Sequence, residues 1–254
     1  MKNIPNYFTL LNLVFGCLAI LFILQTGEQI VILQADGYSQ VNLPEKITWG
    51  ALCIFAAAVV DFLDGFIARL FNAASAMGKQ LDSLADVVSF GVAPSMIIYQ
   101  LLRISFAQQQ DGLDISIIWL LPAFLIACTA AWRLAKFNID TEQEHTFRGL
   151  PSPAAGLFVA SLPLIIWYQY FGIQNYVINK WVLYAVIILL SYFMVSRLPM
   201  MSLKFHDFGW RNNQLRFLLI LAGVAALVIL KWLAVPVIIV LYVIVSLAFK
   251  NRVA

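Results

Sequence analysis

The sequence predicts an all-α fold, a polytopic membrane helix bundle of about eight transmembrane helices. Hydrophobic residues make up 62% of the chain and charged residues only 11%, and the mean hydropathy is +0.87. A soluble domain is nearer half apolar and a quarter charged. The apolar residues also gather into stretches of roughly 20, which is the length that crosses a bilayer.

These stretches define the predicted helices in chain order. They cover approximately residues 8–25, 47–70, 84–102, 115–135, 153–172, 178–196, 214–230 and 232–249. The last two are short and separated only by Lys231, so two helices or one broken helix would fit there. No stretch of soluble composition is long enough to form a second domain. We therefore predict a single integral membrane domain over residues 1–254.

The basic residues are distributed unevenly between the two predicted sides of the membrane. With an even number of spans both termini lie on one side, which receives 12 of the 16 basic residues. Cytoplasmic loops are the richer in Lys and Arg, so we expect both termini in the cytoplasm, together with the connection 69–83. The modest net charge of +3 favours anionic membrane lipids as partners and argues against nucleic acid.

Four aspartates gather where the second predicted helix ends and the third begins. One window of 26 residues holds four of the 13 acidic residues of the chain, namely Asp61, Asp64, Asp82 and Asp86. Helical residues three or four apart share a face, so each helix presents one pair. The short connection makes the helices antiparallel neighbours, and the pairs then converge near the cytoplasmic surface. Carboxylates at a membrane are costly unless something neutralises them.

The residue types in this window favour a divalent cation and a phosphate ligand. Ligands that are all carboxylate oxygen suit Mg²⁺, Mn²⁺ or Ca²⁺ and not zinc. Two such ions would clamp a diphosphate and stabilise charge on its leaving oxygen. The small residues Gly65, Ala68 and Gly78 leave room for a nucleotide against the helix backbone, and Arg69 can pair with a phosphate.

Residues 61–86 match the pattern D-x-x-D-G-x-x-A-R-x(8)-G-x(3)-D-x(3)-D at all eight defined positions. Through this motif the chain resembles the CDP-alcohol phosphatidyltransferases over roughly residues 4–200. The resemblance implies a six-helix catalytic core, with residues 201–254 as additional C-terminal helices, and a homodimer. It also implies a site at the cytoplasmic face holding two Mg²⁺ or Mn²⁺ ions, which Ca²⁺ could replace in a crystal. The implied reaction transfers a phosphatidyl group from a CDP-linked lipid to an alcohol and releases CMP.

Further segments resemble the phosphatidylserine synthase branch of that family. They are residues 5–12, 89–94, 133–138 and 147–156. They imply a CDP-diacylglycerol–serine O-phosphatidyltransferase of phospholipid biosynthesis, expected in a bacterial inner membrane, with CDP-diacylglycerol and L-serine as substrates. Lys136 is one departure, because arginine is expected there more often; charge is kept but bidentate geometry is lost.

The resemblance also implies a role for each candidate residue. Asp61, Asp64 and Asp82 would be metal ligands. Asp86 would act as general base toward the serine hydroxyl and could also touch a metal, so the catalytic candidates are Asp82 and Asp86; spacing leaves open which aspartate is the base. The candidates for binding the CDP moiety are Gly65, Ala68, Arg69, Gly78, Asn6 and Thr9. The candidates for substrate binding are Ser89, Arg133, Lys136 and Arg148.

The three predicted cations each have two possible roles. Arg133, Lys136 and Arg148 would bind the serine carboxylate or the lipid phosphate, or would serve as membrane anchors.

Other functions also stay open at this point. A sibling enzyme of the family would use glycerol 3-phosphate or inositol phosphate and would need a larger basic pocket. An intramembrane prenyltransferase also binds diphosphates through aspartates, but Gly65 and Gly78 match nucleotide binding. A cation transporter would want its carboxylates near the bilayer midplane, away from the basic loops.

Overall fold

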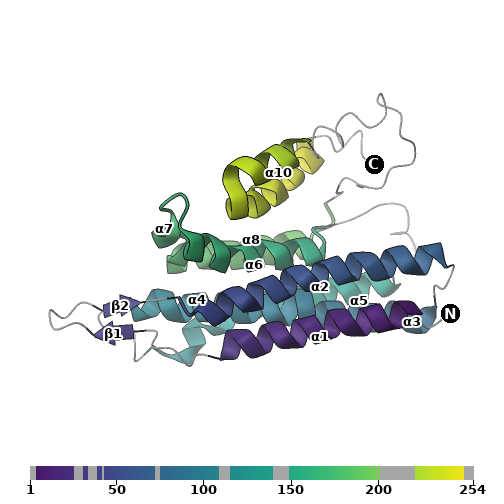
Figure 1. Cartoon of the computed structure of the whole chain (residues 1–254), viewed down its shortest axis with the longest axis horizontal. Coiled ribbons are helices and arrows are strands. Elements are labelled where there is room, and N and C mark those ends of the chain that lie inside the picture. The colour runs from purple at the N-terminus through teal and green to yellow at the C-terminus, as the bar shows by residue number, and fades with distance from the viewer. Residues whose placement is uncertain are drawn as a thin grey trace.

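Long apolar helices run along the length of the molecule (Figure 1). The computed structural model describes residues 4–25, 31–33, 39–41, 43–71, 75–108, 115–139, 149–198, 200 and 221–248. In this described part, five stretches are long and apolar enough to cross a membrane: Pro5–Leu24, Glu45–Leu70, Ala76–Ala107, Ile117–Ile139 and Leu221–Ala248. Two shorter apolar helices are Ser152–Tyr168 and Lys180–Val195. A polytopic helical membrane protein is thereby confirmed, while the total of eight spans stays a prediction.

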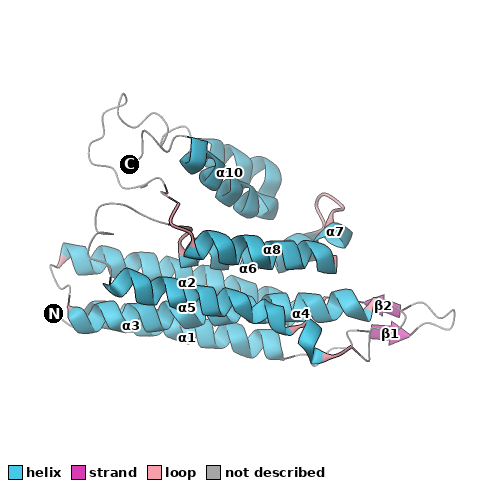
Figure 2. Cartoon of the chain, turned by 180° about the vertical axis from the view of Figure 1, so that it is seen from behind, coloured by secondary structure: helices cyan, strands magenta, loops and turns pink. Residues whose placement is uncertain are grey.

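Helices α1 (Ile4–Leu24) and α2 (Glu45–Leu70) lie antiparallel and side by side (Figure 1). With 21 residues, α1 is about 30 Å long, which matches the hydrocarbon core of a bilayer. Between the two helices, strands β1 (Val31–Leu33) and β2 (Ser39–Val41) form an antiparallel hairpin that the all-α prediction did not include. This hairpin marks one end of the bundle (Figure 2).

At the opposite end of the bundle, α2 ends and a continuous helical stretch begins. It consists of α3 (Ala76–Asp86), a π-helical segment at Val87–Val92, and α4 (Ala93–Ala107). Ser75 caps the stretch, because its side chain accepts a hydrogen bond of 3.0 Å from the backbone N–H of Gly78. The prediction began this helix at residue 84. The earlier start places Asp82 and Asp86 one turn apart on the same helix.

The remaining helices complete the bundle in two further tiers (Figures 1 and 2). Two 3₁₀ turns at Ile117–Trp119 and Leu121–Phe124 lead into α5 (Leu125–Ile139), which lies with α1 to α4. Above them lie α6 (Ser152–Tyr168), the short α7 (Gln174–Ile178) and α8 (Lys180–Val195). The predicted helices 153–172 and 178–196 correspond to α6 and α8.

The C-terminal part forms two helices that fold back on each other. Residues 221–230 are helical, and a 3₁₀ turn at Lys231–Leu233 leads into α10 (Ala234–Ala248). Lys231 adopts a left-handed φ of 51°, which breaks the helix. A Cβ on Gly223 would lie 3.7 Å from Ile238, so the two segments lie side by side. The sequence left one broken helix or two helices open, and the structure shows two.

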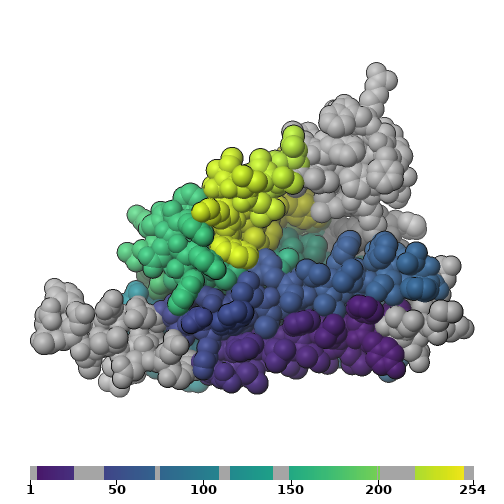
Figure 3. All heavy atoms as spheres, viewed as in Figure 1, coloured from purple at the N-terminus to yellow at the C-terminus, as the bar shows by residue number. Residues whose placement is uncertain are grey.

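Trp232 anchors this pair to the rest of the bundle. Its ring centroid lies 5.6 Å from that of Phe55 in α2 and 6.4 Å from that of Tyr168 in α6. The space-filling view shows the yellow C-terminal pair next to the green helices and above the blue atoms of α2 (Figure 3). The pair is therefore an outer layer on the helices that form the site.

The π-helical segment is held closely by its neighbours. A Cβ on Gly16 of α1 would lie only 2.5 Å from Ser89 Oγ, and one on Gly156 of α6 would lie 3.1 Å from Phe90 Cβ. Ser89 also donates a hydrogen bond of 3.0 Å to the backbone carbonyl of Asn12. These contacts fix the segment between α1 and α6, directly after the last residue of α3. Such π-helical insertions are frequent at functional sites.

Candidate active site

Three carboxylates from two helices converge at the end of the bundle that lies away from the β hairpin. Asp61 and Asp64 of α2 and Asp82 of α3 each offer one oxygen, and these oxygens lie within 4.8 Å of one another. The helical spacing predicted that all four aspartates converge, and the structure groups three of them. Three like charges so close together repel one another strongly unless a cation lies between them.

Asp86 is buried beside this group of three but is not part of it. Its side chain is 6% exposed, and its Oδ1 accepts a hydrogen bond of 3.1 Å from Asn12 Nδ2. Asn12 belongs to α1 and is fully buried. Asn12 therefore orients the fourth aspartate.

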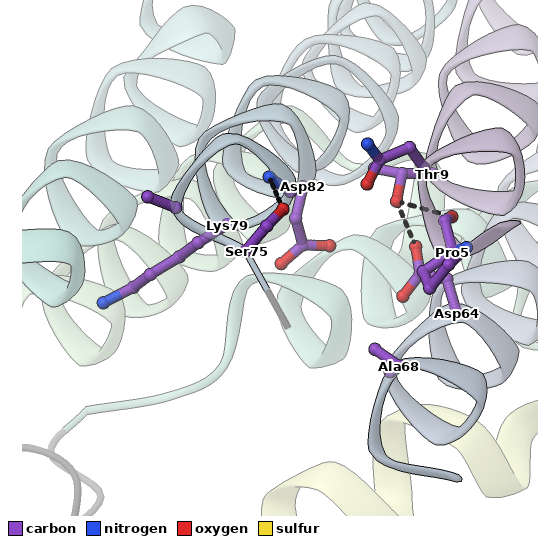
Figure 4. Close-up of a pocket in the computed structure, with 11 residues that line it drawn as sticks. Pro5, Thr9, Asp64, Ala68, Ser75, Lys79 and Asp82 are labelled. Atoms are coloured by element: carbon purple, nitrogen blue, oxygen red, sulfur yellow. Dashed lines mark hydrogen bonds between the residues drawn. The ribbon is translucent and has the colours of Figure 1, made fainter. Parts of the chain in front are cut away.

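Thr9 makes the corresponding contact one turn earlier on α1. Its hydroxyl donates to Asp64 Oδ2 at 2.9 Å and also lies 3.2 Å from the carbonyl oxygen of Pro5 (Figure 4). Thr9 and Asp64 are both buried. Helix α1 therefore holds one carboxylate on each of two neighbouring helices by an uncharged hydrogen-bond donor. Thr9 holds Asp64 of α2, and Asn12 holds Asp86 of α3.

A cavity of about 480 Å³ opens beside the carboxylates. Figure 4 shows Asp64 and Asp82 pointing toward the same space from two helices. The cavity is lined by Pro5, Asn6, Thr9, Asp64, Gly65, Ala68, Ser75, Ala76, Gly78, Lys79 and Asp82. A Cβ on Gly65 would meet no atom within 4 Å, so the backbone of α2 borders open space. The volume of the cavity lies in the range of small-molecule binding sites.

Most of the residues predicted to bind the CDP moiety meet at this cavity. Asn6, Thr9, Gly65, Ala68 and Gly78 all line it. A Cβ on Gly78 would lie 3.1 Å from both Asn6 Oδ1 and Ser75 Oγ, so glycine keeps this corner uncrowded.

Arg69 is the exception among the predicted CDP contacts. It is exposed, and its Nε donates a hydrogen bond of 2.9 Å to the carbonyl of Gly65 on its own helix. Arg69 is not one of the described residues that line the cavity.

The structure separates the residues predicted to bind the substrates. Arg133 donates from Nη1 to Ser152 Oγ at 3.4 Å and lies within electrostatic range of Asp86. Lys136, one turn further along α5, instead lines a second cavity of about 760 Å³. That cavity is lined by Trp132, Ala135, Lys136, Ile139, Val195 and Arg197.

Two more predicted substrate residues have different outcomes. Ser89 is fully buried and donates to the backbone of Asn12, so in the structure it supports a residue that orients Asp86. Arg148 lies outside the described residues. Substrate contacts by either residue stay predictions.

One polar contact near the carboxylates was missed at the sequence level. Asn138 of α5 donates from Nδ2 to Ser83 Oγ of α3 at 2.9 Å. Ser83 lies one helical turn before Asp86, on a neighbouring part of the same helix surface. This spacing was a usable signal for Ser83, but nothing in the sequence paired it with Asn138.

Comparison with known proteins decides the family. The model of the CDP-alcohol phosphatidyltransferase family matches residues 2–193. The chain belongs to this family. Its members use divalent metals, and the all-oxygen donor set of Asp61, Asp64 and Asp82 fits such an ion.

Individual relatives within the family include enzymes named for serine. The chain is 32% identical over 206 residues to the CDP-diacylglycerol–serine O-phosphatidyltransferase of Bacillus subtilis (strain 168), covering 81% of this chain and 94% of the relative. It is 34% identical over 163 residues to the enzyme of that name from Helicobacter pylori (strain J99), covering 63% and 57%. It is also 34% identical over 139 residues to the archaetidylserine synthase of Methanothermobacter thermautotrophicus, covering 53% and 55%. The chain thus spans little more than half the length of the last two relatives.

Proposed function

We propose that this chain transfers a phosphatidyl group from CDP-diacylglycerol to the hydroxyl of L-serine, forming phosphatidylserine and releasing CMP. The observation that carries the proposal is the convergence of Asp61, Asp64 and Asp82 beside a cavity that Gly65 leaves open. The three relatives described above support serine as the acceptor, because each is named for a serine-transfer activity.

Asp61, Asp64 and Asp82 would hold the divalent ions of the family, Mg²⁺ or Mn²⁺, with two ions expected and Asp86 as a further ligand. A cation held there would supply positive charge to neutralise the diphosphate and the negative charge that develops on the departing CMP. Thr9 keeps the Asp64 carboxylate in a fixed orientation through its hydrogen bond. The Asp64 carboxylate is therefore already oriented before a ligand binds.

Asp86 is the residue we assign as general base. It would take the proton from the serine hydroxyl while the serine oxygen forms a bond to the lipid-linked phosphorus. The bond between that phosphorus and the CMP oxygen breaks at the same centre, and CMP leaves with the electron pair. The hydrogen bond from Asn12 orients the Asp86 carboxylate for this transfer. Burial within the bundle keeps competing water away from it.

The cavity supplies the place for the nucleotide. Gly65, Ala68 and Gly78 remove side-chain bulk, and Asn6 and Thr9 present polar atoms from α1. Arg69 would pair with a phosphate after turning away from the Gly65 carbonyl that it contacts in the structure.

The predicted cations would bind the acceptor and the lipid phosphate. Arg133 is the best placed of the predicted cations, because it lies near Asp86. Lys136 and Arg148 would contribute to the lipid phosphate or to the serine carboxylate. Ser89 would act through Asn12, whose backbone it contacts.

The sequence predictions also describe the membrane domain in which the reaction would take place. We propose one integral domain over residues 1–254, with a six-helix core at about 4–200, eight spans in all and a homodimeric assembly. Both termini and the site would face the cytoplasm of a bacterial inner membrane. The site lies where α2 ends and α3 begins, and Arg69 and Lys79 flank that connection, which supports the cytoplasmic placement.

The test uses the full chain purified in detergent micelles with radiolabelled CDP-diacylglycerol. We expect serine-dependent CMP release and a labelled phosphatidylserine product with Mg²⁺ or Mn²⁺, and no product from glycerol 3-phosphate or inositol phosphate. Absence of serine-dependent CMP release with both metals would contradict the proposal. A product from glycerol 3-phosphate would instead identify the sibling activity.

A further inference from the structure

Asn138 has a side-chain amide whose orientation is set by its neighbours. Ser83 donates its single hydroxyl proton to the carbonyl of Lys79 at 3.2 Å. The Ser83 oxygen is then left to accept, and it accepts from Asn138 Nδ2 at 2.9 Å. The amide nitrogen of Asn138 therefore faces α3, and its Oδ1 faces away from that contact.

The other end of this amide is a buried acceptor. Among the residues that the structure describes, Asn138 Oδ1 is buried and has no hydrogen-bond partner. Buried polar atoms are partnered in the great majority of cases, so an exception beside an active site needs an explanation. Since Oδ1 can only accept, the missing partner is a donor.

A second unpaired atom lies on the same helix and has the opposite character. Arg133 Nε is also buried without a hydrogen-bond partner in the described part of the chain, and it can only donate. Arg133 lies near Asp86, and Asn138 reaches the turn of α3 that precedes Asp86. Helix α5 thus carries a lone acceptor and a lone donor, each close to α3.

An amino acid carries the complementary pair of groups. Its ammonium only donates, and its carboxylate only accepts. The aspartates of α2 and α3 also favour a cation near Asn138 over an anion. Neither glycerol 3-phosphate nor inositol phosphate has an ammonium.

We infer that Asn138 binds the α-ammonium group of the serine acceptor through Oδ1, and that it thereby selects an amino acid over other alcohols. The inference rests on the proposed serine transfer and adds to it a specificity-determining residue. Lys79, Ser83 and Asn138 form a chain of hydrogen bonds that fixes the orientation of Oδ1.

The experiment compares serine with 3-hydroxypropanoate, which is serine without its ammonium. KM for serine and the inhibition constant of 3-hydroxypropanoate against serine are measured on the full chain in detergent micelles. In Asn138→Ala we expect KM for serine to rise at least tenfold, while the inhibition constant of 3-hydroxypropanoate changes less than about threefold. KM for CDP-diacylglycerol should not change. Asn138→Asp keeps an acceptor at this position and should restore the preference for serine.

A matched control is available at the other end of the bundle. Asn179 caps α8 by accepting a hydrogen bond of 2.9 Å from the backbone N–H of Trp181. Asn179→Ala should lower thermal stability and leave the preference for serine over 3-hydroxypropanoate unchanged. If Asn138→Ala is too slow to assay, the same two affinities are measured by titration calorimetry in the presence of CMP.

Two results would overturn the inference. An equal loss for serine and 3-hydroxypropanoate in Asn138→Ala would show that Asn138 only braces α5 against α3. A rise in KM for CDP-diacylglycerol alone would place the nucleotide, and not serine, at Oδ1. A wild-type chain that releases no CMP with serine would instead contradict the proposed function, so the two failures are distinguishable.

Discussion

Helix α2 carries two glycines with opposite surroundings. At Gly50, near the β hairpin, a Cβ would lie 2.6 Å from Ile23 Cγ1 and 3.0 Å from the backbone oxygen of Ala19. At Gly65, roughly four turns further along, a Cβ would meet nothing within 4 Å. One glycine lets two helices approach, as small residues do in membrane bundles, and the other leaves space for a ligand.

The side chains around the two glycines differ in the same way. Near Gly50 the contact between α1 and α2 is apolar, with Ala19 and Ile23 fully buried. Near Gly65 the same two helices meet through Thr9 and Asp64. One end of this helix pair therefore contributes stability, while the other end is arranged for chemistry. Substitutions at the two ends should separate these contributions.

The largest effect is expected from Asp82→Asn at the open end. Removing this carboxylate leaves two of the three converging ligands, and we expect product formation to fall by at least about 1,000-fold, which is about 4 kcal/mol in the barrier. Thermal stability without added metal should stay level or rise, because one of three mutually repelling charges is gone.

The same variant tests metal binding without any turnover. The wild-type chain should gain thermal stability when Mn²⁺ is added, since a ligand that binds only the folded state stabilises it. In Asp82→Asn this gain should shrink or vanish. Retained activity together with an unchanged Mn²⁺ response would refute the role assigned to Asp82.

Gly65→Ala should lower activity without harming the fold. An added methyl group would point into the cavity, and we expect kcat/KM for CDP-diacylglycerol to fall about 10- to 100-fold. Stability should be equal or higher by about 0.5–1 kcal/mol, since alanine favours a helix over glycine. Substrate kinetics and thermal unfolding measure the two effects separately. Unchanged kinetics would mean that no substrate lies against this part of α2.

Gly50→Ala should produce the opposite result. The methyl group would press on the backbone of Ala19 and on Ile23, and overpacking of this kind costs about 1–3 kcal/mol of stability. The activity of the molecules that remain folded should match the wild-type value. Thermal unfolding in micelles, combined with activity per folded molecule, checks both statements. A kinetic defect with normal stability would remove the contrast between the two glycines.

Several features of the open end could be predicted because they depend on local spacing. Asp61 and Asp64 are three residues apart, and Asp82 and Asp86 are four apart, so helical geometry alone brings each pair to one face. The glycines Gly65 and Gly78 lie at fixed spacing from these aspartates, and their lack of a side chain indicated room for a nucleotide. The broken C-terminal helix was also visible as two apolar stretches around Lys231.

The partners of these carboxylates could not be predicted, because they come from distant parts of the chain. Thr9 and Asp64 are 55 residues apart, and Asn12 and Asp86 are 74 apart. Only the packing of α1 across the other two helices brings them together. The π-helical segment Val87–Val92 was hidden too, since its sequence resembles any apolar helix.

The direction of a side chain within a helix was equally inaccessible. Arg133 and Lys136 lie one turn apart on α5 and were treated alike at the sequence level. In the structure Arg133 contacts Ser152 near the carboxylates, whereas Lys136 lines a separate cavity. Choosing between them required knowing which face of α5 packs against α3 and α6.

The smallest effect is expected from Thr9→Val, which keeps the shape of the side chain and removes its donor. The hydrogen bond to Asp64 would be lost, and a bond of this kind contributes about 1.5–3 kcal/mol to stability when its acceptor is charged. We expect kcat to fall about 5- to 10-fold with KM for serine unchanged, because Thr9 orients a carboxylate and does not touch the acceptor. Thr9→Ser retains the hydroxyl and should recover most of the rate. A loss as large as that of Asp82→Asn would instead mean that the role of Thr9 goes beyond orienting Asp64. An unaltered rate would show that the Asp64 carboxylate needs no support from α1, and the difference between the two ends of the helix pair would then depend on Gly65 alone.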